Sequence, residues 1–178
     1  MTFDPFVPPS VSPVPAPFGQ FTSFATGGAA NLINSSSGAS VATVAGQTFY
    51  AMGWVPYTVT LTGLIATTGS IGGTDSWILY LWNNLAGAPA ASSVLSGTVS
   101  PAANTKKKFP FLSQVTIPGP GPFWAGLQSN GITDRFLAFP NAVEGFDTGQ
   151  IAGTFGTPPT ISPGVTYAQN LGPFMTTF

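Results

Sequence analysis

The chain has 178 residues with only 4 Lys+Arg and 5 Asp+Glu, a charged share of 5% against about 25% in ordinary soluble domains, and it has neither Cys nor His. A thiol nucleophile, a disulfide, an imidazole base and a zinc site built from His or Cys are therefore excluded. The net charge of −1 argues against broad contact with nucleic acid, which needs clustered Lys and Arg, and the 15 Phe, 4 Tyr and 4 Trp argue against a disordered chain.

The first segment, residues 1–18, is expected to be an extended arm because six of its residues are proline. Proline fixes φ and removes a backbone donor, which favours a polyproline-like conformation. With no basic residue and no apolar core before its prolines, the segment is not expected to be a signal peptide. It carries apolar side chains that a solvated linker does not need: Phe3, Phe6, Val7, Val11, Val14 and Phe18. Two interpretations remain open, a disordered tail and an arm that buries these side chains on a neighbouring subunit.

From residue 40 onward the sequence has the pattern of β-strands. In residues 57–62, apolar side chains alternate with Thr. Residues 77–82 are continuously apolar, which is typical of a central strand buried on both faces. Further strand candidates are residues 92–99, 109–117 and 123–128. Turn residues occur at positions 72–75, 83–84, 86–89, 118–122 and 130–131, and Asn130-Gly131 suits a tight hairpin turn.

The sequence lacks helical periodicity over the length of a helix, about 10–12 residues free of Gly and Pro. Together with the frequent turn signals, this predicts an all-β fold, an antiparallel β-sandwich or jelly roll, over residues 19–145. Residues 146–178 are rich in Gly and Pro and are expected to be edge strands of the sandwich or a second arm. The longest apolar run is far shorter than the roughly 20 residues of a membrane-spanning helix, so no membrane partner is expected.

Acidic residues are the remaining candidates for catalysis or metal binding. The chain has five of them: Asp4, Asp75, Asp134, Glu144 and Asp147. Glu144 and Asp147 could approach each other in a loop and hold calcium with backbone carbonyls, although loop acids beside Gly are more often turn formers. No pattern marks a carboxylate pair for glycoside hydrolysis. We therefore assign no catalytic residue, no metal site and no cofactor, and we expect the protein not to be an enzyme.

Three of the four basic residues form the run Lys106-Lys107-Lys108. The run is either a contact for an acidic partner or a guard against edge pairing beside the apolar residues 109–112, and the second interpretation is favoured. Asp134-Arg135, next to the predicted 130–131 turn, is expected to have a structural role.

The tryptophans raise the question of sugar binding, because aromatic faces stack on sugar rings. Trp77 and Trp82 lie in the continuous apolar run, so core packing is expected for them. Trp54 and Trp124 lie beside turn signals and are the candidate ligand or interface residues. Packing remains the favoured interpretation even for these two.

Two stretches of the sequence have a recognisable pattern. The first is Trp77-Ile78-Leu79-Tyr80-Leu81-Trp82-Asn83-Asn84 followed by Ala86-Gly87-Ala88-Pro89, and the second is Val115-Thr116-Ile117-Pro118-Gly119 followed by Phe123-Trp124-Ala125-Gly126. Together they resemble β-sandwich modules of tailed-phage virion proteins, both head decoration proteins and fibres. In such modules a strand ending in Asn leads to a Gly-containing turn, and a Pro-Gly turn precedes a strand carrying an aromatic pair. The resemblance implies a class of protein and carries over no functional residue.

On these grounds we expect a structural virion protein, specifically a capsid decoration or cement protein that stabilises the shell through its apolar arm and a rigid sandwich. Its partners would be the major capsid protein or other virion proteins and further copies of itself, with a trimer favoured. Its location would be the virion, after synthesis in the host cytoplasm. The alternative is a phage fibre or receptor-binding module that recognises surface glycans. A polysaccharide-degrading enzyme is disfavoured by the residue inventory, and nucleic acid is not an expected partner.

Overall fold

The structure, a computed structural model, describes residues 39–85, 88–95, 102–138, 148–161, 172–173 and 175–177. Within these ranges all regular structure is β and no helix occurs, so the predicted all-β class is confirmed. The expected arm of residues 1–18 and the candidate calcium ligands Glu144 and Asp147 lie outside the described residues. The described ranges also hold no helix that is long and apolar enough to cross a membrane.

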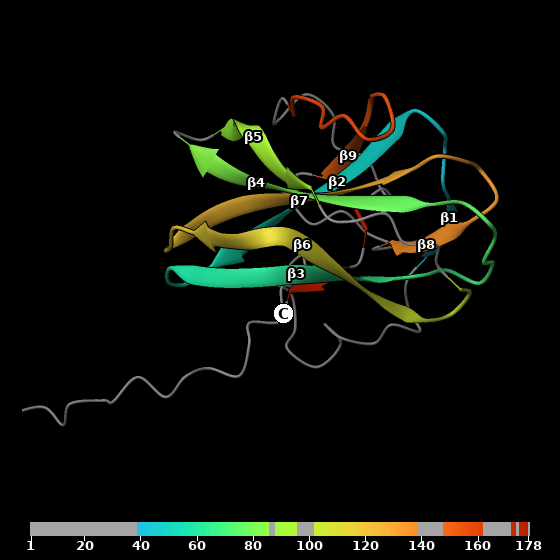
Figure 1. Cartoon of the computed structure of the whole chain (residues 1–178), viewed down its shortest axis with the longest axis horizontal. Helices are drawn as coiled ribbons and strands as arrows, with labels where there is room; N and C mark the ends of the chain where they lie inside the picture. Colours follow the sequence, from blue (N-terminus) through green and yellow to red (C-terminus); the bar gives the residue numbers. More distant parts are fainter. Residues whose placement is uncertain are drawn as a thin grey trace, which may run out of the picture.

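The described residues form ten strands (Figure 1), with the following bounds: β1 (Ala39–Ala42), β2 (Gln47–Val55), β3 (Val59–Thr67), β4 (Trp77–Leu85), β5 (Ala88–Leu95), β6 (Lys106–Ile117), β7 (Gly121–Ser129), β8 (Arg135–Ala138), β9 (Thr148–Ala152) and β10 (Met175–Thr177). All their pairings are antiparallel, as predicted. One sheet has the order β5-β4-β7-β2-β9, a second has the order β10-β3-β6, and β1 pairs with β8.

The β1–β8 pair is attached to the end of β3. An isolated bridge joins Thr68, the residue after β3, to Phe136 in β8. The Arg135 N–H also donates to the Ile71 carbonyl at 3.1 Å. These contacts place the β1–β8 pair beside the chain that leaves β3, and Figure 1 shows β1 and β8 side by side at one end of the molecule.

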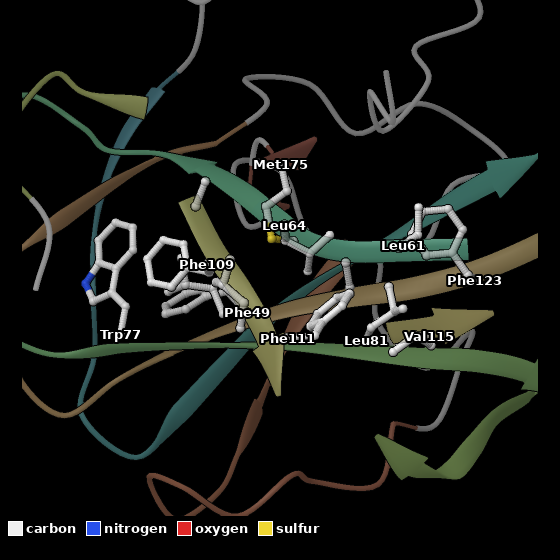
Figure 2. Close-up of a cluster of buried hydrophobic side chains, with 14 of the residues drawn as sticks. Phe49, Leu61, Leu64, Trp77, Leu81, Phe109, Phe111, Val115, Phe123 and Met175 are labelled. Atoms are coloured by element: carbon white, nitrogen blue, oxygen red, sulfur yellow. The ribbon is translucent and has the colours of Figure 1, made fainter. Parts of the chain in front are cut away.

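The main core lies between the two larger sheets. Figure 2 shows side chains of β3 and β6 pointing toward those of β2, β4 and β7. Trp77 stacks on Phe109 with ring centroids 6.4 Å apart, and Phe49 contacts Phe136 at 4.7 Å. The alternation of β6 supplies one wall of this core with its buried residues Phe109, Phe111, Val115 and Ile117. Burial of this apolar surface is the main force that holds the two sheets together.

A second cluster lies on the other face of the five-stranded sheet. Its buried members are Tyr50, Ile78, Tyr80, Trp82, Trp124 and Ile161. Trp77, Leu79 and Leu81 of β4 belong to the main core, whereas the residues between them belong to this cluster. The run 77–82 is therefore a strand buried on both faces, as its continuous apolar sequence predicted.

Two predicted turns are wrong. The Asn130-Gly131 hairpin does not form, because β7 ends at Ser129 and the following strand, β8, pairs with β1 rather than β7. Residues 130–134 instead carry the chain from one sheet to the other. The Asn83-Asn84 turn is also absent, since β4 continues to Leu85 and Asn84 pairs with Pro89 of β5. A local turn signal does not reveal which distant strand will supply the next pairing.

The C-terminal residues that the structure describes include two strands. β9 lies at the edge of the five-stranded sheet beside β2, and β10 lies at the edge of the other sheet beside β3. Between them, Phe155 and Ile161 pack against the second cluster. These parts of residues 146–178 therefore follow the edge-strand alternative rather than the second-arm alternative.

Candidate interaction surface

Exposed apolar side chains mark the parts of the surface that another molecule could cover. In the described part of the chain six large ones are exposed: Val44, Trp54, Tyr57, Ile71, Leu112 and Ile132. Trp54 and Tyr57 lie at the end of β2 and just after it, Leu112 lies in the middle of β6, and the other three lie in the β1–β2, β3–β4 and β7–β8 loops.

Trp54 is exposed because it lies near the end of β2 on the outer face of the five-stranded sheet. The side chains of β2 alternate, so that Phe49 and Val55 enter the main core while Tyr50 and Met52 pack on the outer face. Trp54 continues the outer series, and 45% of its surface is exposed. Tyr57, in the connection to β3, is 48% exposed. Trp54 therefore remains a candidate contact residue, with Tyr57 added to it.

Trp124 does not share this surface. Only 2% of it is exposed, because it lies inside β7 between Met52 of β2 and Trp82 of β4. Its ring meets Tyr50 edge-on at 5.9 Å. The turn signal at 118–122 suggested a surface position, but β7 begins at Gly121 and carries Trp124 into the second cluster. The packing alternative applies to Trp124, which has no surface available to a ligand.

The lysine run lies inside β6 rather than before it. Among the described strands β6 has one neighbour, β3, so it is an edge strand. Lys106 and Lys108 are exposed on it, which is the position where charged side chains discourage pairing with a strand of another molecule. This placement agrees with the interpretation of the run as a guard against edge pairing.

A bulge follows the lysines on the same strand. Leu61 of β3 pairs with Val115, but Gly63 pairs with Pro110, so residues 111–114 of β6 face a single residue of β3. Leu112 lies in this bulge with 78% of its surface exposed, the largest exposure of the six exposed large apolar residues. The sequence pattern placed Leu112 in a strand without indicating that it faces solvent.

The charged groups of the described ranges are distributed unevenly. Both acids there, Asp75 and Asp134, are buried, whereas Lys106 and Lys108 are exposed. Arg135 is half-buried, and its Nη1 donates to the Ser40 carbonyl at 2.7 Å, a structural role as expected. The exposed charge of this part of the protein is therefore basic.

The two buried acids differ in their surroundings. Burial acts to raise the pKa of Asp75, but hydrogen bonds from the Thr133 hydroxyl and from the N–H groups of Asp134 and Thr133 lower it below its usual value. Burial raises the pKa of Asp134, and the charge of Asp75 raises it further. No sequence pattern indicated this pair, because the two residues are far apart in the chain and only the fold brings their loops together.

A buried polar network holds the C-terminal segment on the second cluster. The Tyr80 hydroxyl donates to Gln128 Oε1 at 2.7 Å, and Gln128 Nε2 donates to Thr48 Oγ1 at 2.7 Å. Gln128 also reaches the segment after β9, donating to the Thr157 carbonyl and accepting from the Gly156 N–H. Burial raises the pKa of Tyr80 to about 12, so its hydroxyl remains a donor at neutral pH.

The described residues offer little for a cofactor. They contain no group of three or more His, Cys, Asp or Glu side chains. A small cavity is lined by Ala51, Met52, Gly53, Leu64, Phe123, Ala125, Pro173 and Met175, and these residues provide no polar side chain to orient a ligand. Comparison with known protein families, curated proteins and solved structures yields no match to this chain.

Proposed function

We propose that this protein is a β-sandwich of jelly-roll type that serves as a structural virion protein, a decoration or cement protein on a capsid. The strand order is the observation that carries the proposal. A jelly roll folds eight antiparallel strands into two facing sheets. When its strands are numbered along the chain, their order across one sheet is 1-8-3-6 and across the other 5-4-7-2.

The strand pairings of this chain support that order. The five-stranded sheet has the spatial order β5-β4-β7-β2, with β9 added beside β2. β1 pairs with β8, the Thr68–Phe136 bridge links β8 to the end of β3, and β3 pairs with β6. Both sheets contribute to one core. Jelly rolls are the fold of viral capsid and lectin domains, which leaves a structural and a sugar-binding role to be separated by the surface.

The surface supports the structural role. Exposed apolar side chains occur in several separate places, and only 9 residues in the whole chain are charged. Such a surface is suited to being covered by other proteins. The apolar residues of segment 1–18 would anchor the protein, since each Phe or Val that becomes fully buried contributes about 1.5–3 kcal/mol. Repetition over a shell adds avidity.

Deletion of residues 1–18 tests this attachment. The variant should lose binding to capsids prepared without the protein, while it keeps all ten described strands, the first of which begins at Ala39, and its thermal unfolding serves as the check that it is folded. A second variant keeps the full length of the chain but replaces Phe3, Phe6 and Phe18 by Ser, and it should also lose binding. Full occupancy of capsids by both variants would contradict the arm mechanism.

The alternative function, a fibre module that recognises surface glycans, is favoured by one observation. Trp54 and Tyr57 are both about half exposed near the end of β2. A glycan array with wild-type protein and Trp54→Ala separates the two functions. A glycan signal that disappears in Trp54→Ala, together with capsid binding that does not depend on residues 1–18, would favour the receptor-binding role.

A further inference from the structure

Two carboxylates meet where the 68–76 segment between β3 and β4 contacts the 130–134 segment between β7 and β8. Asp75 Oδ2 accepts the Thr133 N–H at 2.7 Å and the Asp134 N–H at 3.1 Å. The Asp134 carboxylate is close enough to Asp75 to feel its charge. The pair thus lies between two loops whose aspartates are 59 residues apart in the sequence.

Asp134 is the residue whose surroundings require a ligand. Its side chain is 0% exposed, and neither carboxylate oxygen has a hydrogen-bond partner in the part of the chain that the structure describes. Its backbone is fully used, because the N–H donates to Asp75 and the carbonyl accepts from Thr43. A buried carboxylate without a partner is strongly disfavoured, so either a proton or a positive charge must compensate it.

The neighbouring guanidinium does not supply that charge, since Arg135 Nη1 donates to the Ser40 carbonyl instead. Two donors lie beside the Asp134 carboxylate, the Gly73 N–H and the Trp77 indole N–H, although neither meets the geometry of a hydrogen bond. The N–H donors beside Asp134 favour its ionised form, and an ionised Asp134 next to the ionised Asp75 places two negative charges close together, which a bound cation would compensate. The arrangement favours a cation.

Two glycines show that side-chain oxygen atoms pack closely against the backbones of both loops. A Cβ on Gly73 would collide with Thr133 Oγ1 and Asp134 Oδ1, and a Cβ on Gly131 would collide with the Asp75 carboxylate. Carboxylate, hydroxyl and carbonyl oxygens are the ligands of hard divalent cations. Ca²⁺ accepts flexible arrangements of about six to eight oxygens, whereas Mg²⁺ demands near-ideal octahedral geometry.

We propose that Asp75, Thr133 and Asp134 form a divalent-cation site, with Ca²⁺ as the best-fitting ion, and that the ion fastens the β3–β4 loop to the β7–β8 loop. Backbone carbonyls and water would complete the coordination. With only two carboxylates, the dissociation constant should fall in the weak range of extracellular calcium modules, about 10⁻⁴–10⁻³ M. The site goes beyond the proposed function and does not depend on it.

Thermal unfolding of the full-length protein tests the proposal. Ca²⁺ at about ten times the dissociation constant should raise Tm by about 3–10 °C above the value measured with a chelator. Mg²⁺ at the same concentration should raise Tm less. Asp134→Asn should abolish the response and unfold at a higher temperature than wild type in chelator, because it removes the uncompensated charge. The Glu144→Gln, Asp147→Asn double variant is the matched acidic control and should keep the full response.

Tb³⁺ luminescence provides a second readout, which a purely structural role of these residues would not change. If Asp134→Asn folds poorly, Asp75→Asn serves as the second variant for this measurement. Trp77 lies beside Asp134, so Tb³⁺ at the site should be sensitised by this indole, and Ca²⁺ should displace it. Emission should fall at least fivefold in either variant. Equal emission or an equal Ca²⁺ response in the variants would overturn the site. So would a wild-type Tm that ignores Ca²⁺ but rises in chelator as the pH is lowered, which would assign a proton to Asp134.

Discussion

Gln128 shows how one side chain can hold a segment in place. It lies in β7, is 1% exposed, and both ends of its amide are used: Oε1 accepts from Tyr80, and Nε2 donates to Thr48. The same amide binds the backbone of residues 156 and 157, which lead to Ile161 in the second cluster. The amide thereby supplies hydrogen-bond partners to two backbone groups that lie after the end of β9.

Replacement of Gln128 by Ala should destabilise the protein by about 2–3 kcal/mol, because the Tyr80 hydroxyl and Thr48 Oγ1 would remain buried without this partner. Denaturant unfolding measures the loss. Gln150→Ala is the matched control, since Gln150 is exposed on β9, and it should stay within about 0.5 kcal/mol of wild type. Similar losses in both variants would show that the Gln128 network carries no special share of stability.

The strand β6 combines two opposing features at the element scale. Its first three residues are lysines and it ends in buried apolar residues, with the exposed Leu112 between them. An edge strand of this length would be a template for pairing with another chain if nothing interrupted it. The lysines, the exposed Pro110 and the bulge at 111–114 are interruptions that β6 carries.

Replacement of Lys106 and Lys108 by Val should therefore promote association through β6 without loss of the fold. We expect unchanged or slightly higher Tm together with a rise in light scattering on storage, because Val favours strands and removes the repulsion between chains. Lys106→Glu with Lys108→Glu is the control and should remain free of this scattering. Equal scattering in the Val and Glu variants would indicate that edge pairing is not what the lysines oppose.

How much of an element can be read from the sequence depends on whether its signal is local. The strand at 77–82 was predictable because burial on both faces needs apolar residues at every position, and Trp77 to Trp82 supply them. The Asn130-Gly131 hairpin failed because pairing depends on a distant partner: β8 finds β1, which lies more than ninety residues earlier. The same reason hid the Asp75–Asp134 pair and misplaced Trp124, whose burial is decided by its neighbours on β2 and β4.

At the scale of the whole molecule, the scarcity of charge has a structural counterpart. The two acids in the described ranges are buried, so they give the surface no negative charge, and the exposed lysines sit on a single strand. Most of the other exposed residues in these ranges are Thr, Ser, Gly or Pro, with isolated apolar side chains among them. A protein with a net charge of −1 has little electrostatic repulsion between its copies, which favours association at high concentration.

The purified protein should accordingly form oligomers as its concentration rises, and the exposed apolar side chains should control this. Leu112→Ser combined with Trp54→Ser should shift the self-association midpoint to at least about tenfold higher concentration, the change expected from about 1.4 kcal/mol of lost burial. Sedimentation velocity over a concentration series measures the shift. Ser113→Ala, next to Leu112 in the same bulge and also exposed, is the control that should leave the midpoint unchanged. A wild-type protein that stays monomeric at high concentration would contradict the view that its low charge serves an assembly, whereas association that survives the double substitution would place the contact elsewhere on the chain.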